Sequence, residues 1–162
     1  MKTIGLLSDT HSYIDNKIIT HFEDCDEIWH AGDVGNAAVI EALQQTKPVI
    51  AVFGNIDGND VKALAPEWQF FTCEGMKVVI THIGGYPPKY NKRVLPVLKK
   101  YQPDIFICGH SHILKIIYDK ELQLLHLNPG AAGKQGFQKV RTLLKFTIHN
   151  GNISNMRIIE LA

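Results

Sequence analysis

The chain has 162 residues and a mass of 18.2 kDa, with 45% hydrophobic residues, 20% charged residues and a mean hydropathy of −0.05. These values are typical of a globular protein and exclude disordered and fibrous classes. The net charge of +1 provides no strong field that would draw the chain to nucleic acid or to an anionic membrane. Histidine is frequent, with eight residues against three cysteines, and we expect one domain over residues 1–162.

The first third of the chain predicts alternating strands and helices. Strands are expected at Thr3–Ser8, Glu27–His30 and Pro48–Phe53. The intervening segments Asp15–Phe22 and Ala37–Gln45 carry apolar residues at helical spacing. This β-α-β-α-β order indicates a parallel arrangement with right-handed crossovers.

The rest of the chain is richer in strands that are joined by hairpins. The strands Trp68–Cys73 and Lys77–Thr81 are connected through Glu74–Gly75, and a helix over Val94–Tyr101 leads into the apolar strand Ile105–Cys108. Hairpin turns at 119–121 and 150–152 separate four further expected strands, which are Leu114–Tyr118, Leu122–Leu127, Thr142–Ile148 and Ser154–Ile159. The two parts together predict an α/β fold of two stacked mixed sheets with helices outside.

Cysteine usage and apolar segments indicate the compartment. Cys25, Cys73 and Cys108 are odd in number and lack a C-x-x-C pair, so we expect buried free thiols. The N-terminal apolar run of five residues is too short for a signal peptide. No segment approaches the ~20 apolar residues that a membrane helix needs. We therefore expect a soluble, cytoplasmic protein.

Five of the apolar strands run directly into side chains that can bind a metal. In α/β sheets, ligands bind beyond the carboxyl ends of the strands, so these side chains are expected at one edge. They are Asp9, His11, Asp33, Asn55, His82, His110 and His112. The histidines outside this set, which lack a comparable setting, are His21, His30, His126 and His149. His30 lies close to Asp33 in the sequence and could support it, but a core or surface role is favoured.

Each of these residues has a structural alternative when it is considered alone. Asp9 could cap the following helix, Asp33 and Asn55 could occupy turns, and His82 could be a core histidine. Two histidines after one buried strand, His110 and His112, are harder to explain without a partner. Five such coincidences at strand ends are improbable, which favours a shared site.

The proposed ligands are imidazoles, carboxylates and one amide, without thiolate. This set suits divalent Mn, Fe, Zn or Ni. Seven side chains oversupply a single ion, whereas two ions that share one carboxylate would each have four protein ligands. Paired ions clamp the attacking and leaving oxygens and activate a water, which is the chemistry of phosphoester hydrolysis.

In these motifs the chain resembles the calcineurin-like metallophosphoesterases over nearly its whole length. The family's five blocks occur in order as Asp9-Thr10-His11, Gly32-Asp33, Gly54-Asn55-Ile56-Asp57, His82 and Gly109-His110-Ser111-His112. The short length and the turn Asn128-Pro129-Gly130 are most similar to the small bacterial and archaeal phosphodiesterase branch. The resemblance implies a four-layer α/β/β/α sandwich of two mixed sheets with flanking helices.

The resemblance also implies how the ligands divide between two divalent ions. One ion would be held by Asp9, His11, Asp33 and His112. The other would be held by Asp33, Asn55, His82 and His110, with Asp33 as the bridge. Mn²⁺ is expected first, with Fe, Ni or Zn as alternatives. Asp33, Asn55 and His82 are expected to act in catalysis, and Asp57 is expected to order the asparagine loop.

The chain departs from the family pattern at two positions. Ile56 stands where the G-N-H-E form has a histidine that protonates the leaving alkoxide, so diesters and activated esters are expected as substrates. The block Thr81-His82-Ile83-Gly84-Gly85 differs from the commoner G-H-G or H-G-H, although its histidine is kept as a ligand.

The segment 84–93 combines glycines, prolines, tyrosines and cations directly after His82. Lys89, Tyr90 and Arg93 are expected to contact a nonbridging phosphate oxygen, and a solvated loop is the alternative. Lys134 is a weaker candidate for a phosphate contact because its glycines do not have Walker spacing. The aromatic residues Trp68, Phe70 and Phe71 are expected in the core, with an interface as the alternative.

The predicted function is hydrolysis of a small phosphoester, above all a phosphodiester, by a metal-activated water or hydroxide. The alternative is a non-catalytic protein-interaction scaffold on the same fold, since fold alone does not settle activity. A nuclease is disfavoured because the chain has no basic stripe. Neither tight nucleic-acid binding nor membrane binding is expected, and an oligomer is left open.

Overall fold

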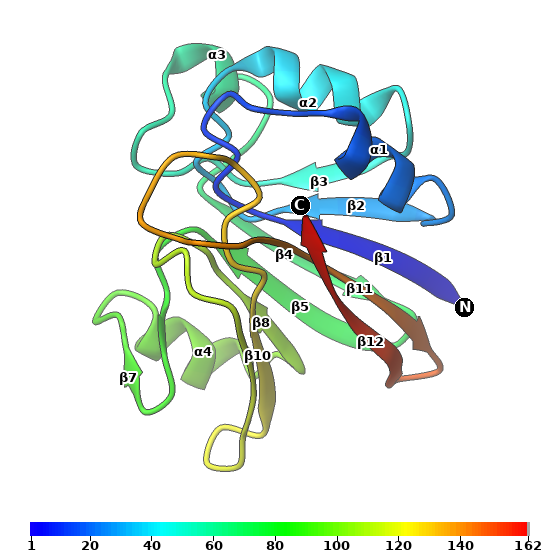
Figure 1. Ribbon diagram of the computed structural model, residues 1–162. Coiled ribbons are helices and arrows are strands. Elements are labelled where there is room, and N and C mark those ends of the chain that lie inside the picture. The colour runs from blue at the N-terminus through cyan, green and yellow to red at the C-terminus, as the bar shows by residue number, and fades with distance from the viewer. Residues whose placement is uncertain (162) are drawn as a thin grey trace.

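The structure is a computed structural model that describes residues 1–161, within which two five-stranded sheets are stacked (Figure 1). The first sheet has the order β12-β11-β1-β2-β3. Its strands are β1 (Lys2–Leu7), β2 (Glu27–His30), β3 (Val49–Ala51), β11 (Arg141–His149) and β12 (Asn152–Leu161). The second sheet has the order β4-β5-β8-β10-β9. Its strands are β4 (Trp68–Cys73), β5 (Met76–Thr81), β8 (Ile105–Ile107), β9 (Lys115–Asp119) and β10 (Leu124–Asn128).

Both sheets are mixed. In the first sheet β1, β2 and β3 are parallel, and β11 and β12 extend it in antiparallel register, with Gly5 opposite Lys145. In the second sheet β5, β8 and β10 are parallel, while β4 and β9 form antiparallel edges. The parallel strands of each sheet therefore end at one edge, where ligands are expected.

The helices cover the outer faces of the two sheets (Figure 1). They are α1 (Asn16–Phe22), α2 (Ala37–Gln44), α3 (Asn59–Lys62) and α4 (Leu95–Tyr101). The first three pack on the first sheet through residues such as Phe22 and Leu43, and α4 packs on the second sheet through Leu98. Between the sheets lies a core that includes Trp29, Ile80 and others from both sides. The four-layer α/β/β/α arrangement of two mixed sheets is thereby confirmed.

Several element boundaries differ from the sequence prediction for local reasons. The third strand stops at Ala51 because the Phe53 N–H donates to the Pro66 carbonyl, away from the β2 ladder. The turn after β9 is longer than expected because Asp119 Oδ1 accepts from the N–H groups of Glu121 and Leu122. The predicted turn at Glu74–Gly75 joins β4 to β5.

Three short elements were not predicted. Helix α3 has a single turn, too short to show helical periodicity. Strands β6 (Gly85–Tyr86) and β7 (Lys89–Tyr90) form a two-residue ladder inside the segment that was expected to be a shaped loop. Among residues 1–161, no helix is long and apolar enough to cross a membrane.

The structure shows which of the cysteine and aromatic side chains are buried and which are exposed. Cys25, Cys73 and Cys108 are buried free thiols, as expected. Phe71 packs edge-to-face on the core Trp29, while Phe70 is 46% exposed and stacks on Trp68. The core prediction therefore holds for Phe71 and is wrong for Phe70, whose side chain points to the outer surface of the edge strand β4.

His126 on β10 is fully buried between the rings of Tyr90 and Phe106. Neither ring nitrogen of His126 has a hydrogen-bond partner among the described residues. Burial lowers the pKa of His126 to about 4, assisted by Lys115 and opposed by Asp119. This histidine therefore stays neutral in the folded protein at pH values where an exposed imidazole is protonated.

We expect His126→Phe to reduce the loss of stability at acid pH. An unfolded histidine has a pKa near 6.5, so between pH 6.5 and 4 the unfolded chain binds a proton that the folded His126 does not. The folded wild-type protein should therefore lose up to about 3 kcal/mol relative to the variant across this window. Urea unfolding at several pH values measures the difference, and parallel pH profiles would contradict the account.

Candidate metal centre

The seven candidate ligands come together where the carboxyl ends of the two sheets meet. Asp9 and His11 follow β1, Asp33 follows β2, His82 follows β5, and His110 and His112 follow β8. Main-chain hydrogen bonds tie these loops together: Asp9 N–H donates to Gly32 O at 2.9 Å, and Gly109 N–H donates to His82 O at 2.9 Å. Each of these bonds joins loops of one sheet, and the His110 N–H, which donates to Asp9 Oδ2 at 3.1 Å, links the loops of the two sheets.

Asp9, His11 and His112 form the first of two groups with ligand geometry. One ligand atom from each lies within 4.8 Å of the other two. Asp9 Oδ1 is 3.2 Å from His112 Nε2 and 3.9 Å from His11 Nε2. Asp9 is fully buried, and its other carboxylate oxygen accepts from the Ser8 hydroxyl and the His110 N–H. One oxygen is therefore anchored while Oδ1 faces the two imidazoles.

Asp33, His82 and His110 form the second group, also within 4.8 Å of one another. Asp33 Oδ2 is 3.2 Å from His82 Nε2. Asn55 joins this group, since its Oδ1 lies 3.0 Å from His110 Nδ1. Asn55 and His110 are exposed, whereas Asp33 and His82 are buried. The centre therefore opens to solvent on the side of Asn55 and His110.

Asp33 connects the two groups. Its Oδ2 is 3.6 Å from His11 Nε2 in the first group and 3.2 Å from His82 Nε2 in the second. Its Oδ1 accepts from the Ile56 N–H at 3.1 Å, which fixes the plane of the carboxylate. This placement suits the bridging position that the family resemblance gives to Asp33.

Burial and neighbouring charges shift the pKa values of the buried residues of the site. Burial raises the pKa of Asp9, against the opposing effects of His82 and the Ser8 hydroxyl. Burial also acts to raise the pKa of Asp33, but contact with His82 and the Ile56 amide outweighs it, so that pKa lies below its usual range. For His82, burial acts to lower the pKa, and Asp33 and Asp9 raise it above its usual value. Both carboxylates thus depend on positive charge nearby.

Unpartnered atoms show that these residues fit divalent cations. Asp9 Oδ1, His11 Nε2 and His82 Nε2 are buried and have no hydrogen-bond partner among the described residues. Buried polar atoms are normally paired, because an unpaired one costs about 1–3 kcal/mol. Here the unpaired atoms point at one another across 3.8 and 3.9 Å. The donor set matches cations that prefer nitrogen and oxygen ligands.

The backbone that presents the ligands is itself strained. Positive φ angles of 45° to 71° occur at Asp9, His11, Asp33, His110 and His112. Such angles disfavour residues with a side chain, and they cluster at sites where function requires them. A Cβ at Gly54 would lie 2.1 Å from Asp33 Oδ1, and one at Gly109 would lie 2.1 Å from Ser8 Oγ. The glycines of the motifs therefore permit the close approach of the loops.

Hydrogen bonds from groups outside the seven candidate ligands orient the His82 ring and hold the ligand loops in place. The Ala31 carbonyl accepts from His82 Nδ1 at 2.8 Å, which leaves Nε2 free to act as a ligand. The carboxylate of Asp57 accepts from the N–H groups of Gly54, Val34 and Gly35 and so ties the asparagine loop to the Asp33 loop. This is the ordering role that the sequence suggested for Asp57.

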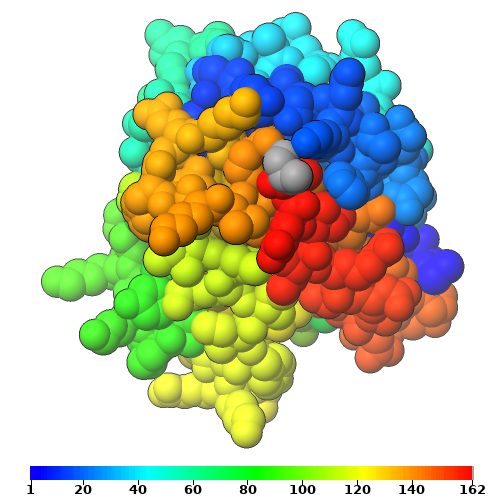
Figure 2. Space-filling view, viewed as in Figure 1, coloured from blue at the N-terminus to red at the C-terminus, as the bar shows by residue number. Residues whose placement is uncertain are grey.

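Gln138 is an orienting residue that the sequence did not suggest. Its side-chain nitrogen donates to the carbonyls of Gly133 and Gln135, so its Oε1 faces His112 Nδ1 at 2.9 Å. Residues 130–133 of the irregular segment 130–140 are buried, and the remainder lies on the surface, where the orange region of Figure 2 lies between the blue N-terminal region and the yellow region after His112. The segment has no helix or strand and no periodic pattern, so only the fold reveals the contact.

Other candidate residues have partners of their own. Asp15, rather than Asp9, caps α1 by accepting from the Ile18 N–H. The Tyr90 hydroxyl donates to Asp119 at 2.7 Å, on the outer side of the second sheet. The Lys134 ammonium lies 4.5 Å from the centre of the Tyr13 ring.

His30 is a structural member of the site's surroundings. It is buried, its Nδ1 accepts from the Gly32 N–H at 3.1 Å, and its Nε2 lies 3.0 Å from the Thr10 hydroxyl. Burial lowers the pKa of His30 to about 3, so the ring is neutral. It therefore ties the Thr10 and Gly32 loops together without facing the ligands.

We expect Gln138→Ala to weaken metal binding. Without the Gln138 oxygen, His112 loses the hydrogen-bond partner of Nδ1 that directs Nε2 toward Asp9, and loss of such an outer partner lowers metal affinity about 10- to 100-fold. Calorimetric titration of the stripped protein with Mn²⁺ measures the effect. Gln135→Ala, which keeps the carbonyl that Gln138 uses, is the matched control. Equal affinities for wild type and both variants would show that Gln138 has no orienting role.

The chain is similar to several proteins described as phosphoesterases. A probable metallophosphoesterase of Methanocaldococcus jannaschii is 30% identical over 134 residues, which cover 79% of this chain and 67% of that protein. A probable metallophosphoesterase of Mycoplasma pneumoniae is 28% identical and covers 96% of both chains. Among solved structures, a novel archaeal phosphodiesterase superposes with a TM-score of 0.77 and 25% identity over 98% of this chain and 99% of that one.

A more distant neighbour shares the fold alone. Zinc-bound Vps29 from Entamoeba histolytica has a TM-score of 0.76 at 15% identity, over 98% of each chain. The decisive match is to the family description "Calcineurin-like phosphoesterase superfamily domain", which covers residues 1–151 and so includes every candidate ligand. The chain belongs to the calcineurin-like metallophosphoesterase superfamily.

Proposed function

We propose that this protein is a two-metal phosphodiesterase that hydrolyses a small phosphodiester, with Mn²⁺ as the first choice of ion. The observation on which the proposal rests is the pair of ligand groups with Asp33 between them. The neighbour described as an archaeal phosphodiesterase, at 25% identity, supports a diester as the substrate class. A cytoplasmic location is part of the same proposal.

The seven candidate ligands would be shared between two ions in such a centre. When bound, two divalent ions supply a nucleophilic water at neutral pH and neutralise charge on the attacked phosphate. Asp9, His11 and His112 would hold one ion, and His82, His110 and Asn55 would hold the other, with Asp33 shared. An aspartate carboxylate is ionised at neutral pH, as a shared metal ligand has to be. The exposed Asn55 and His110 leave room for a phosphate to approach from solvent.

Ile56 favours activated esters within the proposed substrate class. Its side chain is 46% exposed and carries no proton to give to a leaving alkoxide. Only its backbone N–H acts in the site, as a donor to Asp33. General acid catalysis contributes about 100- to 10,000-fold where it is present. Without it, a leaving group must be a weaker base, which disfavours simple alkyl monoesters.

A non-catalytic scaffold is the second candidate function. The Vps29 neighbours have the same fold at 14–18% identity, and fold alone leaves activity open. A scaffold has no need of paired ligands with orienting partners. This chain keeps all seven candidate side chains together, and three of their atoms are buried without a partner. The enzyme is therefore the better supported function.

We expect metal-stripped protein to hydrolyse bis(p-nitrophenyl) phosphate after addition of Mn²⁺. Asp33→Asn should lower kcat/KM at least about 100-fold, because it removes the shared ligand, and loss of even an outer partner costs about 10- to 100-fold. The control is Asp60→Asn, because Asp60 is an exposed acid that accepts from the Ala37 N–H at 2.8 Å and faces no ligand. Release of p-nitrophenol reports the rate.

Two results would contradict the proposed enzyme. The first is no turnover with Mn²⁺, Ni²⁺, Zn²⁺ or Mg²⁺. The second is turnover that Asp33→Asn leaves at the wild-type level, which would assign the hydrolysis to something other than this centre.

A further inference from the structure

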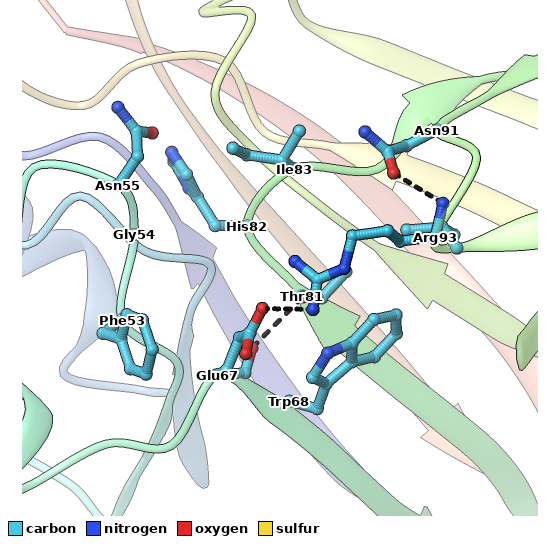
Figure 3. A pocket seen from close by; sticks show the side chains of 11 residues that line it. Phe53, Gly54, Asn55, Glu67, Trp68, Thr81, His82, Ile83, Asn91 and Arg93 are labelled. Carbon is cyan, nitrogen blue, oxygen red and sulfur yellow. Dashed lines mark hydrogen bonds and ion pairs between the residues drawn. The ribbon is translucent and has the colours of Figure 1, made fainter.

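A cavity of about 240 Å³ lies directly beside the metal centre. Two candidate ligands, Asn55 and His82, form part of its wall (Figure 3). The rest of the wall comes from the loops after β3 and β5, the start of β4 and the residues before α4, and it includes Phe53, Glu67, Trp68, Ile83, Asn91 and Arg93. A phosphate at the centre would therefore have this cavity within reach of one ester substituent.

The wall combines aromatic surface with a few polar groups. Phe53 and Trp68 are half-buried, and Ile83 is 39% exposed. In the view of Figure 3, Phe53 and Trp68 lie on opposite sides of the Glu67 carboxylate. Trp68 also packs against the core beneath α4, which fixes its position. Fixed aromatic side chains with few polar groups are typical of sites that bind a planar ring.

The charges in the cavity cancel. Apart from the candidate ligand His82, Glu67 and Arg93 are its only charged residues among those described, and their side chains form an ion pair at 3.1 Å (Figure 3). A second phosphate or a carboxylate would find no unpaired cation there. The pair is exposed, with 74% of the Arg93 side chain accessible, and exposed pairs are worth at most about 1 kcal/mol. The polar edge of a ligand ring can therefore replace the Glu67–Arg93 ion pair at a small cost in free energy.

The size of the cavity limits what it can hold. Pockets for drug-sized ligands measure about 300–1,000 Å³, so this smaller cavity suits a single ring system. Asn91 uses its side-chain oxygen to accept from the Arg93 N–H, which leaves its amide nitrogen available to a ligand. Aromatic surface, neutral charge and hydrogen-bonding groups at the rim together match a nucleobase better than an aliphatic chain.

We propose that this cavity is a subsite for an uncharged heteroaromatic ring of nucleobase type, carried by one ester oxygen of the substrate. The inference rests on the proposed phosphodiesterase function and narrows its substrate class to diesters that bear such a ring. The face of the Trp68 ring that Phe70 does not cover provides the stacking surface. Arg93 provides hydrogen bonds to the edge of the ligand ring once the Glu67–Arg93 ion pair has opened.

Adenosine tests the cavity without any phosphate or metal. Saturation-transfer NMR on the metal-free protein should detect binding of adenosine and not of ribose. Trp68→Leu should weaken adenosine binding about 5- to 150-fold, since stacking of a base on an aromatic ring is worth about 1–3 kcal/mol. Arg93→Ala, an exposed position that does not endanger folding, should weaken it severalfold. Tyr118→Leu, exposed on β9 and outside the cavity, is the control.

A second experiment tests whether a ligand in the cavity inhibits hydrolysis. With Mn²⁺ present, adenosine should inhibit hydrolysis of bis(p-nitrophenyl) phosphate competitively, and ribose should not. Equal binding of adenosine and ribose, or adenosine binding unchanged by both cavity variants, would overturn the subsite. Diester hydrolysis that adenosine does not affect would also overturn the subsite and leave the enzyme intact. Absence of hydrolysis with every metal would instead refute the enzyme, while the NMR arm still decides whether the cavity binds a base.

Discussion

The buried carboxylates of Asp9 and Asp33 lie among imidazole nitrogens at the edge that the two sheets share. Two negative charges in a buried site are unfavourable unless positive charge lies between them. Within the described residues, the only groups close enough to provide it are histidines, and two of these direct unpaired nitrogens at the carboxylates. Divalent cations would satisfy the carboxylates and the histidines together, which is why the arrangement is best explained as a metal centre.

The remainder of the fold can be understood as the support for that arrangement. Three apolar clusters, one between the sheets and one beneath each helical layer, hold the strands in place. The loops beyond the strand ends can then adopt strained backbone angles, which cost of order 1–3 kcal/mol each. Main-chain contacts between the loops after β1 and β2 and between those after β5 and β8 keep the ligands within reach of one another. Function therefore lies in loops that a rigid core positions.

Much of this was visible in the sequence because the ligands follow apolar strands within short motifs. The role of the glycines before Asn55 and His110 as places of close approach came only from the structure. Gln138 was not predictable, since it reaches His112 from an irregular segment 26 residues away. The cavity beside the centre combines loops from four parts of the chain, so no local pattern marks it. Helix α3 and the hairpin of β6 and β7 were too short for any periodicity to appear.

The number and position of bound ions test the central claim most directly. Crystals grown with Mn²⁺ and measured at its absorption edge report each ion by anomalous scattering. The account predicts two peaks in each chain, one beside Asp9, His11 and His112 and one beside His82, His110 and Asn55, with the carboxylate of Asp33 in contact with both. A single peak, or peaks away from these residues, would contradict it.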